Sequence, residues 1–88
     1  MKMPVFAIRD QRSAEFLFPA PDANELCAKR SFQRAVCSGE GLIGFSPEDF
    51  DLYQVGSYDS TSAQFESCIP EFVCNGIDVL DMRKQNES

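Results

Sequence analysis

Residues 22–37 read DANELCAKRSFQRAVC, a stretch with the periodicity of an amphipathic helix. Its apolar positions recur along one helical stripe that would face a core, namely Ala28, Phe32, Ala35 and Val36. Asp22 can accept hydrogen bonds from the free amides of the first turn, and Glu25 would complete a capping box. We therefore expect a helix from about residue 23 to residue 37, ended by the flexible residues 38–41.

The segment before this helix has the composition of β-strands. Residues 4–9 (PVFAIR) and 14–18 (AEFLF) predict a hairpin around a polar turn, with Phe16 and Phe18 on one face. The run Pro19-Ala20-Pro21 is expected to end the second strand, because proline cannot continue a hydrogen-bonded ladder.

A second set of strands follows the helix. Residues 46–49 (SPED) predict one short helical turn, with the serine as cap and the proline at the first position. Residues 50–57 and 63–67 predict another hairpin around the polar turn 59–62. Residues 77–80 (IDVL) alternate in polarity and predict a short fifth strand near the C-terminus.

Together these elements predict an α+β fold. Two β-hairpins form an antiparallel sheet with one helix packed on a face, in the order ββαββ. We expect residues 1–81 to form a single compact domain and residues 82–88 to be a polar C-terminal tail. A chain of 88 residues builds only a marginally sufficient core, so association into a homodimer is expected.

The composition disfavours several classes of function. Hydrophobic residues make up 43% of the chain, the balance of a folded domain, and the net charge of −6 is unlike that of a histone-like DNA binder. No stretch approaches the ~20 apolar residues of a membrane-spanning helix, and no signal peptide is recognised. Histidine is absent, which rules out the usual acyl-transfer triads. We therefore expect a cytosolic protein that is not a hydrolase.

No residue pattern predicts a catalytic, metal or cofactor site. The four cysteines match no zinc-site spacing and are expected to be reduced thiols, with a bridge or cluster formed after isolation as the alternative: Cys27, Cys37, Cys68 and Cys74. The carboxylates of residues 48–51 lack the spacing of a calcium loop, and capping of a short turn explains Glu48 and Asp49. We therefore expect no enzymatic activity, no metal and no cofactor.

Charge is divided unevenly along the chain. Residues 1–37 carry six basic and four acidic side chains, a net charge of +2, whereas residues 38–88 carry two basic and ten acidic ones, a net charge of −8. Three interpretations stay open. The basic part could bind nucleic acid, the acidic part could mimic nucleic acid or dock on a basic protein, or both could be solvated faces. The division could also support head-to-tail contact between subunits.

The candidate nucleic-acid-binding residues are all basic. Lys29, Arg30 and Arg34 would lie on the solvent side of the predicted helix, and Arg9 and Arg12 from the first hairpin would join them. Such a cluster could hold phosphates despite the overall negative charge.

Aromatic side chains allow two interpretations. They could stack bases on a face of the sheet, or they could pack in the core and at a dimer interface, which is the more ordinary arrangement. The set comprises Phe6, Phe16, Phe18, Phe45, Phe50, Tyr53, Tyr58, Phe65 and Phe72.

Several motifs recur together in one known family. They are residues 5–10 (VFAIRD), 29–32 (KRSF), 46–50 (SPEDF) and 52–59 (LYQVGSYD), and the most specific piece is Pro-Glu-Asp-aromatic leading into a strand that ends Gly-x-aromatic-Asp. In these residues the chain resembles the small nonstructural proteins of gokushoviruses, the microvirus phages with circular single-stranded DNA. The resemblance covers roughly residues 4–66. Asn75-Gly76 also fits it, whereas residues 68–74 depart from the family pattern.

The resemblance implies a phage protein made in the cytoplasm of the infected bacterial host and absent from the mature virion. It also implies DNA binding around the switch to single-stranded genome synthesis, with Lys29 and Arg30 at the basic positions of the similar proteins. We therefore expect a non-enzymatic accessory protein that acts in single-stranded DNA synthesis or packaging through weak nucleic-acid contact. The alternative is an acidic module that engages a host or phage protein.

Overall fold

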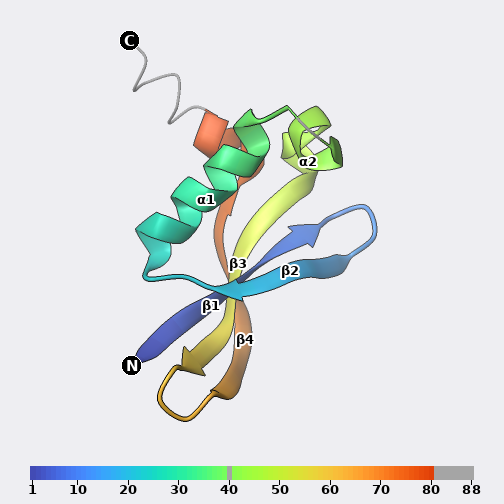
Figure 1. The fold of residues 1–88 in the computed structure, drawn as a ribbon. Helices are drawn as coiled ribbons and strands as arrows, with labels where there is room; N and C mark the ends of the chain where they lie inside the picture. Colours follow the sequence, from blue (N-terminus) through green and yellow to red (C-terminus); the bar gives the residue numbers. More distant parts are fainter. Residues whose placement is uncertain (40, 81–88) are drawn as a thin grey trace.

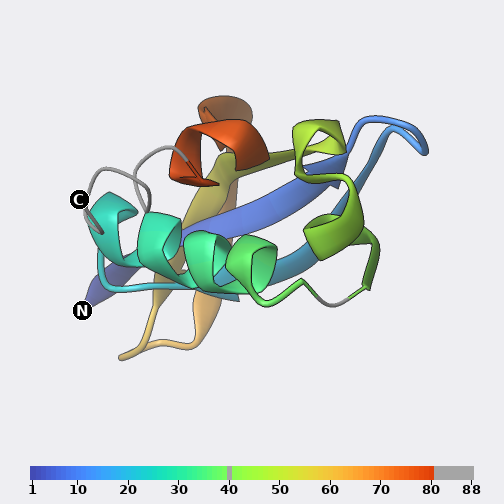
Figure 2. The ribbon, with the colours of Figure 1, turned by 90° about the horizontal axis from the view of Figure 1, so that it is seen from above.

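A four-stranded antiparallel sheet with one long helix on its face makes up most of residues 1–39 and 41–80, the part of the chain that the computed structural model describes (Figure 1). In the order of the sheet the strands are β2 (Glu15–Pro21), β1 (Lys2–Asp10), β3 (Phe50–Asp59) and β4 (Gln64–Asn75). The helix α1 (Glu25–Cys37) lies over one face, and α2 (Gly41–Phe45) and the 3₁₀ turn η1 (Pro47–Asp49) connect it to β3 (Figures 1 and 2).

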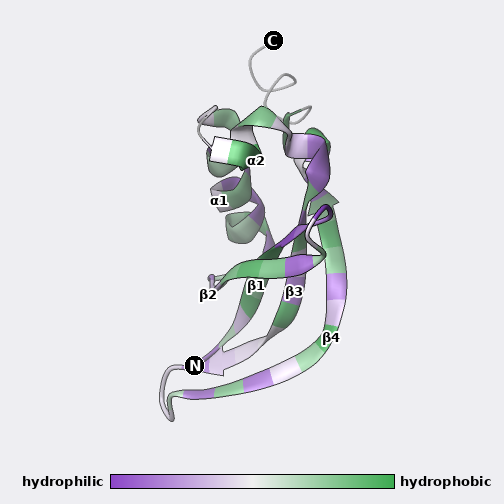
Figure 3. Cartoon of the chain, turned by 90° about the vertical axis from the view of Figure 1, so that its right-hand side faces the viewer, coloured by the Kyte–Doolittle hydropathy of each residue, from purple (hydrophilic) through white to green (hydrophobic). Residues whose placement is uncertain are grey.

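The predicted α+β class, with two antiparallel hairpins in one sheet, is confirmed. The simple order ββαββ is incomplete, because α2, η1 and a helical segment at residues 76–80 are added to it. The predicted tail at residues 82–88 lies outside the described residues. Seen from the side, α1 and α2 lie on the same side of the sheet, and within the described residues no helix covers its opposite face (Figure 3).

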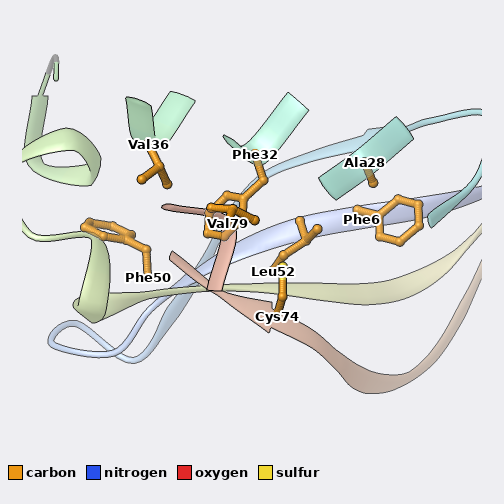
Figure 4. Packing of buried hydrophobic residues seen from close by; sticks show 8 residues of the cluster. All are labelled: Phe6, Ala28, Phe32, Val36, Phe50, Leu52, Cys74 and Val79. Atoms are coloured by element: carbon orange, nitrogen blue, oxygen red, sulfur yellow. The ribbon is translucent and has the colours of Figure 1, made fainter. Parts of the chain in front are cut away.

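The core lies between α1 and the sheet (Figure 4). The predicted helical stripe is confirmed, since Ala28, Phe32 and Val36 are buried and Ala35 is half-buried. They pack with side chains from the strands and from residues 76–80, which are Phe6, Phe50, Leu52, Cys74 and Val79. Phe32 of α1 and Val79 of the helical segment are almost completely excluded from solvent. Both helices therefore contribute side chains to the same core.

The helix begins two residues later than expected. Asn24 is its N-cap, with its side chain accepting a hydrogen bond of 2.9 Å from the amide of Cys27. The backbone amide of Asp22 donates to the carbonyl of Pro4, so this residue is still tied to the sheet. The Asp22 carboxylate accepts from the Ala23 amide and from the hydroxyl of Ser31 instead of capping the first turn.

The prediction that the prolines end the second strand is wrong. β2 continues to Pro21, which pairs with Val5 of β1. β2 lies at the edge of the sheet, where a residue whose N–H points away from the neighbouring strand loses no ladder bond when it is proline.

Phe16 and Phe18 lie on opposite faces of the sheet, contrary to the prediction. The pairing of β1 with β2 shifts between Phe6 and Ile8, and Phe18 has a φ of +53°, which together form a β-bulge. Alternation is broken there, so Leu17 and Phe18 both line the helix side together with Ile8, whereas Phe16 pairs with Arg9.

β4 is longer than the predicted strand 63–67 and runs through Pro70 to Asn75, again along a sheet edge. The predicted fifth strand at 77–80 is wrong, because residues 76–80 are helical. The Asn75 side chain accepts from the amide of Ile77, and the Asp78 carboxylate accepts from the amide of Asn75 at 2.8 Å. This reciprocal pair is a capping box, which starts a helix.

Candidate nucleic-acid interface

The face of the sheet turned away from α1 is the candidate interface, and we call it the outer face. Ile8 and Leu52 pair across β1 and β3 and pack toward the core on the helix side. Because successive strand residues point to opposite faces, their neighbours Arg9 and Tyr53 belong to the outer face. No described helix covers this face (Figure 3).

Three aromatic rings from three strands form a row on the outer face, and we call Phe16, Tyr53 and Phe72 the aromatic row. The ring centroids of Phe16 and Tyr53 are 5.3 Å apart, and those of Tyr53 and Phe72 are 5.8 Å apart, both in edge-to-face geometry. Ala7 of the central strand pairs with Tyr53, and its small side chain leaves room for the rings on either side. Phe16 is 43% exposed and Phe72 is 57% exposed, so the row is accessible to a ligand.

Arg9 is the cation beside this row. Its guanidinium lies 5.8 Å from the ring centroid of Phe16, a cation–π contact. Among the described residues no carboxylate lies within ion-pair distance of it. The outer face therefore combines exposed π-systems with one cation that has no acidic partner within the described range.

The five predicted basic residues do not form one surface. Lys29, Arg30 and Arg34 lie along α1, on the other side of the sheet from Arg9. Lys29 is partly shielded and forms an ion pair of 3.8 Å with Glu25, whereas Arg30 and Arg34 are exposed.

Arg12 lies apart from both groups, in the turn of the first hairpin. Its Nε is 2.7 Å from Oδ2 of Asp49. This hydrogen bond and the charge of Asp49 raise the pKa of the Arg12 guanidinium above its ordinary value. Because a carboxylate already neutralises it, Arg12 is a poor phosphate ligand.

The remaining aromatic residues fall into separate places. Phe6 and Phe50 are core residues, and Tyr58 and Phe65 form a pair of rings 4.7 Å apart near the second hairpin turn. Phe18 and Phe45 are exposed on the helix side. The aromatic set thus divides between core and surface, and only part of it is available for stacking.

Asp51 was missed by the sequence analysis as an organising residue. It is a buried carboxylate that accepts hydrogen bonds from Gln11 and Asn75. Asn75 and Gln11 also both donate to the carbonyl of Glu48 in η1. The η1 motif, which is part of the family resemblance, is therefore bonded to the end of β4 and to the turn of the first hairpin. An Asn-Gly pair that follows a strand is the signal that could have placed this junction.

Nowhere in residues 1–39 and 41–80 do three side chains of the metal-binding types come together, and no helix there is long and apolar enough to cross a membrane. All four cysteines are free thiols, and burial raises the pKa of Cys74 to about 11.

Comparison with known proteins places this architecture in a family. The family model described as "Phage ORF5 protein" matches residues 3–79, which include all but the first residue of the sheet, the whole of α1 and all but the last residue of the helical segment. The chain belongs to the phage ORF5 protein family. The predicted assignment to a phage protein is thereby confirmed. No curated protein and no solved structure matches the chain.

In this ORF5 family member the matched region includes the aromatic row, Arg9 and the Asp51 junction. It also includes the cations of α1, so membership by itself does not favour one of the two basic surfaces.

Proposed function

We propose that this ORF5 protein is a non-enzymatic accessory protein that binds single-stranded DNA weakly through the outer face of its sheet. It acts in genome synthesis or packaging in the host cytoplasm, in a phage of the gokushovirus type. The observation that carries the proposal is the exposed aromatic row with Arg9 beside it. The sequence resemblance to gokushovirus nonstructural proteins supports the setting.

Unpaired bases fit this surface better than a duplex does. The faces of bases are free to stack on protein aromatics only where the strand is single, and such stacking tolerates any sequence. Phe16 and Phe72 flank Tyr53 and present exposed rings on both sides of the row. Each stacked base contributes about 1–3 kcal/mol, so two or three of them give weak binding.

Stacking has to dominate because the electrostatics are unfavourable overall. The chain carries a net charge of −6, and the outer face has Arg9 as its cation next to the row. One phosphate contact on a single strand gives a slope of about −0.7 in log K against log salt. Binding by Lys29, Arg30 and Arg34 would instead involve three contacts, with a slope of about −2. The salt dependence therefore distinguishes the two surfaces.

The experiment is fluorescence anisotropy of a labelled single-stranded oligonucleotide, titrated at several salt concentrations. The variant Phe16→Ala with Phe72→Ala is expected to weaken binding by about tenfold or more, because two stacking contacts are lost. Phe45→Ala is the control, since it removes an even more exposed ring, which lies on the helix side. A parallel variant carries Glu at positions 29, 30 and 34.

The outcomes are distinct. A shallow salt slope and sensitivity to the aromatic row alone support the proposal. A steep dependence of log K on log salt, with loss of binding in the variant of positions 29, 30 and 34, would show that α1 binds the DNA instead of the outer face. No saturable binding at the lowest salt contradicts nucleic-acid binding by either surface.

The alternative function, an acidic module that engages another protein, has one specific observation in its favour. An apolar groove with carboxylates at its rim lies on the helix side of the sheet. A partner protein that remains bound to the purified protein after nuclease treatment would favour this alternative.

A further inference from the structure

An apolar groove of about 540 Å³ lies on the helix side of the sheet. It lies between the first hairpin, the C-terminal half of α1 and α2, and we call it the hairpin groove. Apolar side chains form most of its lining, namely Ile8, Leu17, Phe18, Ala35, Leu42, Ile43 and Phe50. A second hollow of about 310 Å³ shares the lining residues Asp10, Leu42 and Phe50 with it, so the two lie next to each other.

Large apolar side chains around this groove are left in solvent. Phe18, Leu42 and Phe45 are 72%, 70% and 82% exposed. Single exposed apolar residues are common on protein surfaces, but a contiguous group that lines a groove marks a site of protein contact.

Carboxylates lie at the end of this apolar surface that is nearest the turn of the first hairpin. Asp10 lines both hollows, Asp49 lines the smaller one, and Glu15 pairs with Asp10 across the hairpin. Arg12 forms an ion pair with Asp49 and its charge also acts on Asp10, whose carboxylate accepts a hydrogen bond from the Arg12 amide, whereas Glu15 has no ion pair within the described residues. The groove therefore suits an occupant that combines an apolar anchor with positive charge.

The same chain carries such a surface on α1. Leu26, Arg30 and Arg34 follow each other at four-residue spacing, and all three are exposed. They lie on the side of the helix opposite Ala28 and Phe32, and we call them the α1 stripe. Because the buried face of α1 packs on its own sheet, the α1 stripe points away from the groove of its own molecule and can reach only that of another.

We propose that the α1 stripe of one copy docks in the hairpin groove of the next copy. Leu26 supplies the apolar anchor, and Arg30 and Arg34 face the carboxylates of Asp10 and Glu15. The two surfaces differ, so the contact is head-to-tail, leaves a free groove and a free stripe at the ends, and builds linear chains of copies. This inference does not depend on DNA binding, since the outer face takes no part in it.

The test is sedimentation velocity of the full chain without DNA, over a wide range of protein concentration. The average sedimentation coefficient is expected to rise with concentration and to fall with added salt. Arg30→Glu with Arg34→Glu changes only the stripe, and Leu42→Lys with Phe45→Ala changes only the groove. Each variant is expected to weaken association by about tenfold or more. Phe65→Ala, an exposed ring on β4, is the control and should associate as the unmodified chain does.

Mixing the two variants gives the decisive result. The stripe variant retains an intact groove and the groove variant retains an intact stripe, so an equimolar mixture should form a 1:1 dimer and nothing larger. A chain that stays monomeric at every concentration overturns the proposal and leaves the groove to a basic segment of a different protein. A closed dimer that both variants preserve also overturns it. The oligonucleotide titration of the same variants reports on DNA binding separately.

Discussion

The side-chain amide of Asn75 donates a hydrogen bond of 2.8 Å to the carboxylate of Asp51, which is only 7% exposed. The other carboxylate oxygen accepts a bond of 2.9 Å from Gln11 in the turn after β1. One buried acid therefore joins the first hairpin, the start of β3 and the end of β4. A buried carboxylate without such partners is costly, because desolvation of its charge is not compensated.

Asn75→Ala is expected to lower the free energy of unfolding by about 2–3 kcal/mol, since it leaves one side of Asp51 without a donor. Urea denaturation measures this value. Gln11→Ala, at an exposed turn where water can replace the amide, should cost about 1 kcal/mol. Equal small losses in the two variants would show that Asp51 does not organise the junction.

Gly76 is expected to tolerate no side chain. A Cβ built there would collide with the carbonyl oxygen of Pro47 in η1. Gly76→Ala should therefore lower stability by about 2–3 kcal/mol, as overpacking does elsewhere. Gly39→Ala is the comparison, because its φ of +73° strains an alanine but no atom lies within 4 Å, and its cost should be about 1 kcal/mol. Thermal unfolding of both variants shows which of the two substitutions lowers stability more.

Phe32 is expected to contribute a large part of the free energy of unfolding. It is almost fully buried between α1 and the sheet, so Phe32→Ala is expected to cost about 3–5 kcal/mol. Leu26→Ala on the opposite side of the same helix should change stability by less than about 0.5 kcal/mol. Both are measured in dilute protein, where self-association does not contribute. A comparable loss at Leu26 would contradict the observed orientation of α1.

The thiol of Cys74 is expected to be unreactive. Burial raises its pKa from an ordinary value of 9.0 to about 11, so at pH 8 it is ~100-fold less ionised than an unperturbed cysteine. Iodoacetamide followed by mass spectrometry should label the exposed Cys68 long before Cys74. Early labelling of Cys74 in the folded protein would disagree with the packing of the core.

The same shift predicts a loss of stability in alkali. The Cys74 thiol of the unfolded chain ionises near pH 9, whereas that of the folded chain ionises near pH 11. Between these values the unfolded state binds fewer protons, so the free energy of unfolding falls as pH rises from about 9 to about 11. Melting curves of Cys74→Val should lose less stability over this interval than those of the unmodified chain.

The general plan of the fold was predictable because it depends on local patterns. The stripe of α1 and the alternation of the strands identified the layers and the buried face of the helix. The errors arose where tertiary position decides local structure. Pro21 was interpreted as a strand end and the predicted strand 63–67 stopped before Pro70, but both prolines lie within edge strands, and edge position depends on strand order, which the sequence does not contain.

The candidate site was less predictable for the same reason. The sequence gives no reason to place Arg9 and Arg30 on different surfaces. In the folded chain they lie on opposite sides of the sheet. The aromatic row joins residues as distant in sequence as Phe16 and Phe72, and the bulge at Phe18 changes which rings share a face. Residues 77–80 were assigned to a strand from their alternation, whereas the side chain of Asn75 starts a helix there.

The prolines of the two outer strands also affect how the protein behaves when it is crowded. β2 contains Pro19 and Pro21, and β4 contains Pro70 beside a register shift where residues 68–70 stand opposite Val55. An open strand edge is a template on which further chains can polymerise into amyloid. Natural proteins prevent this with prolines, which lack a backbone N–H donor, and with β-bulges. This small sheet can thus leave apolar side chains in solvent without offering an edge for fibril growth.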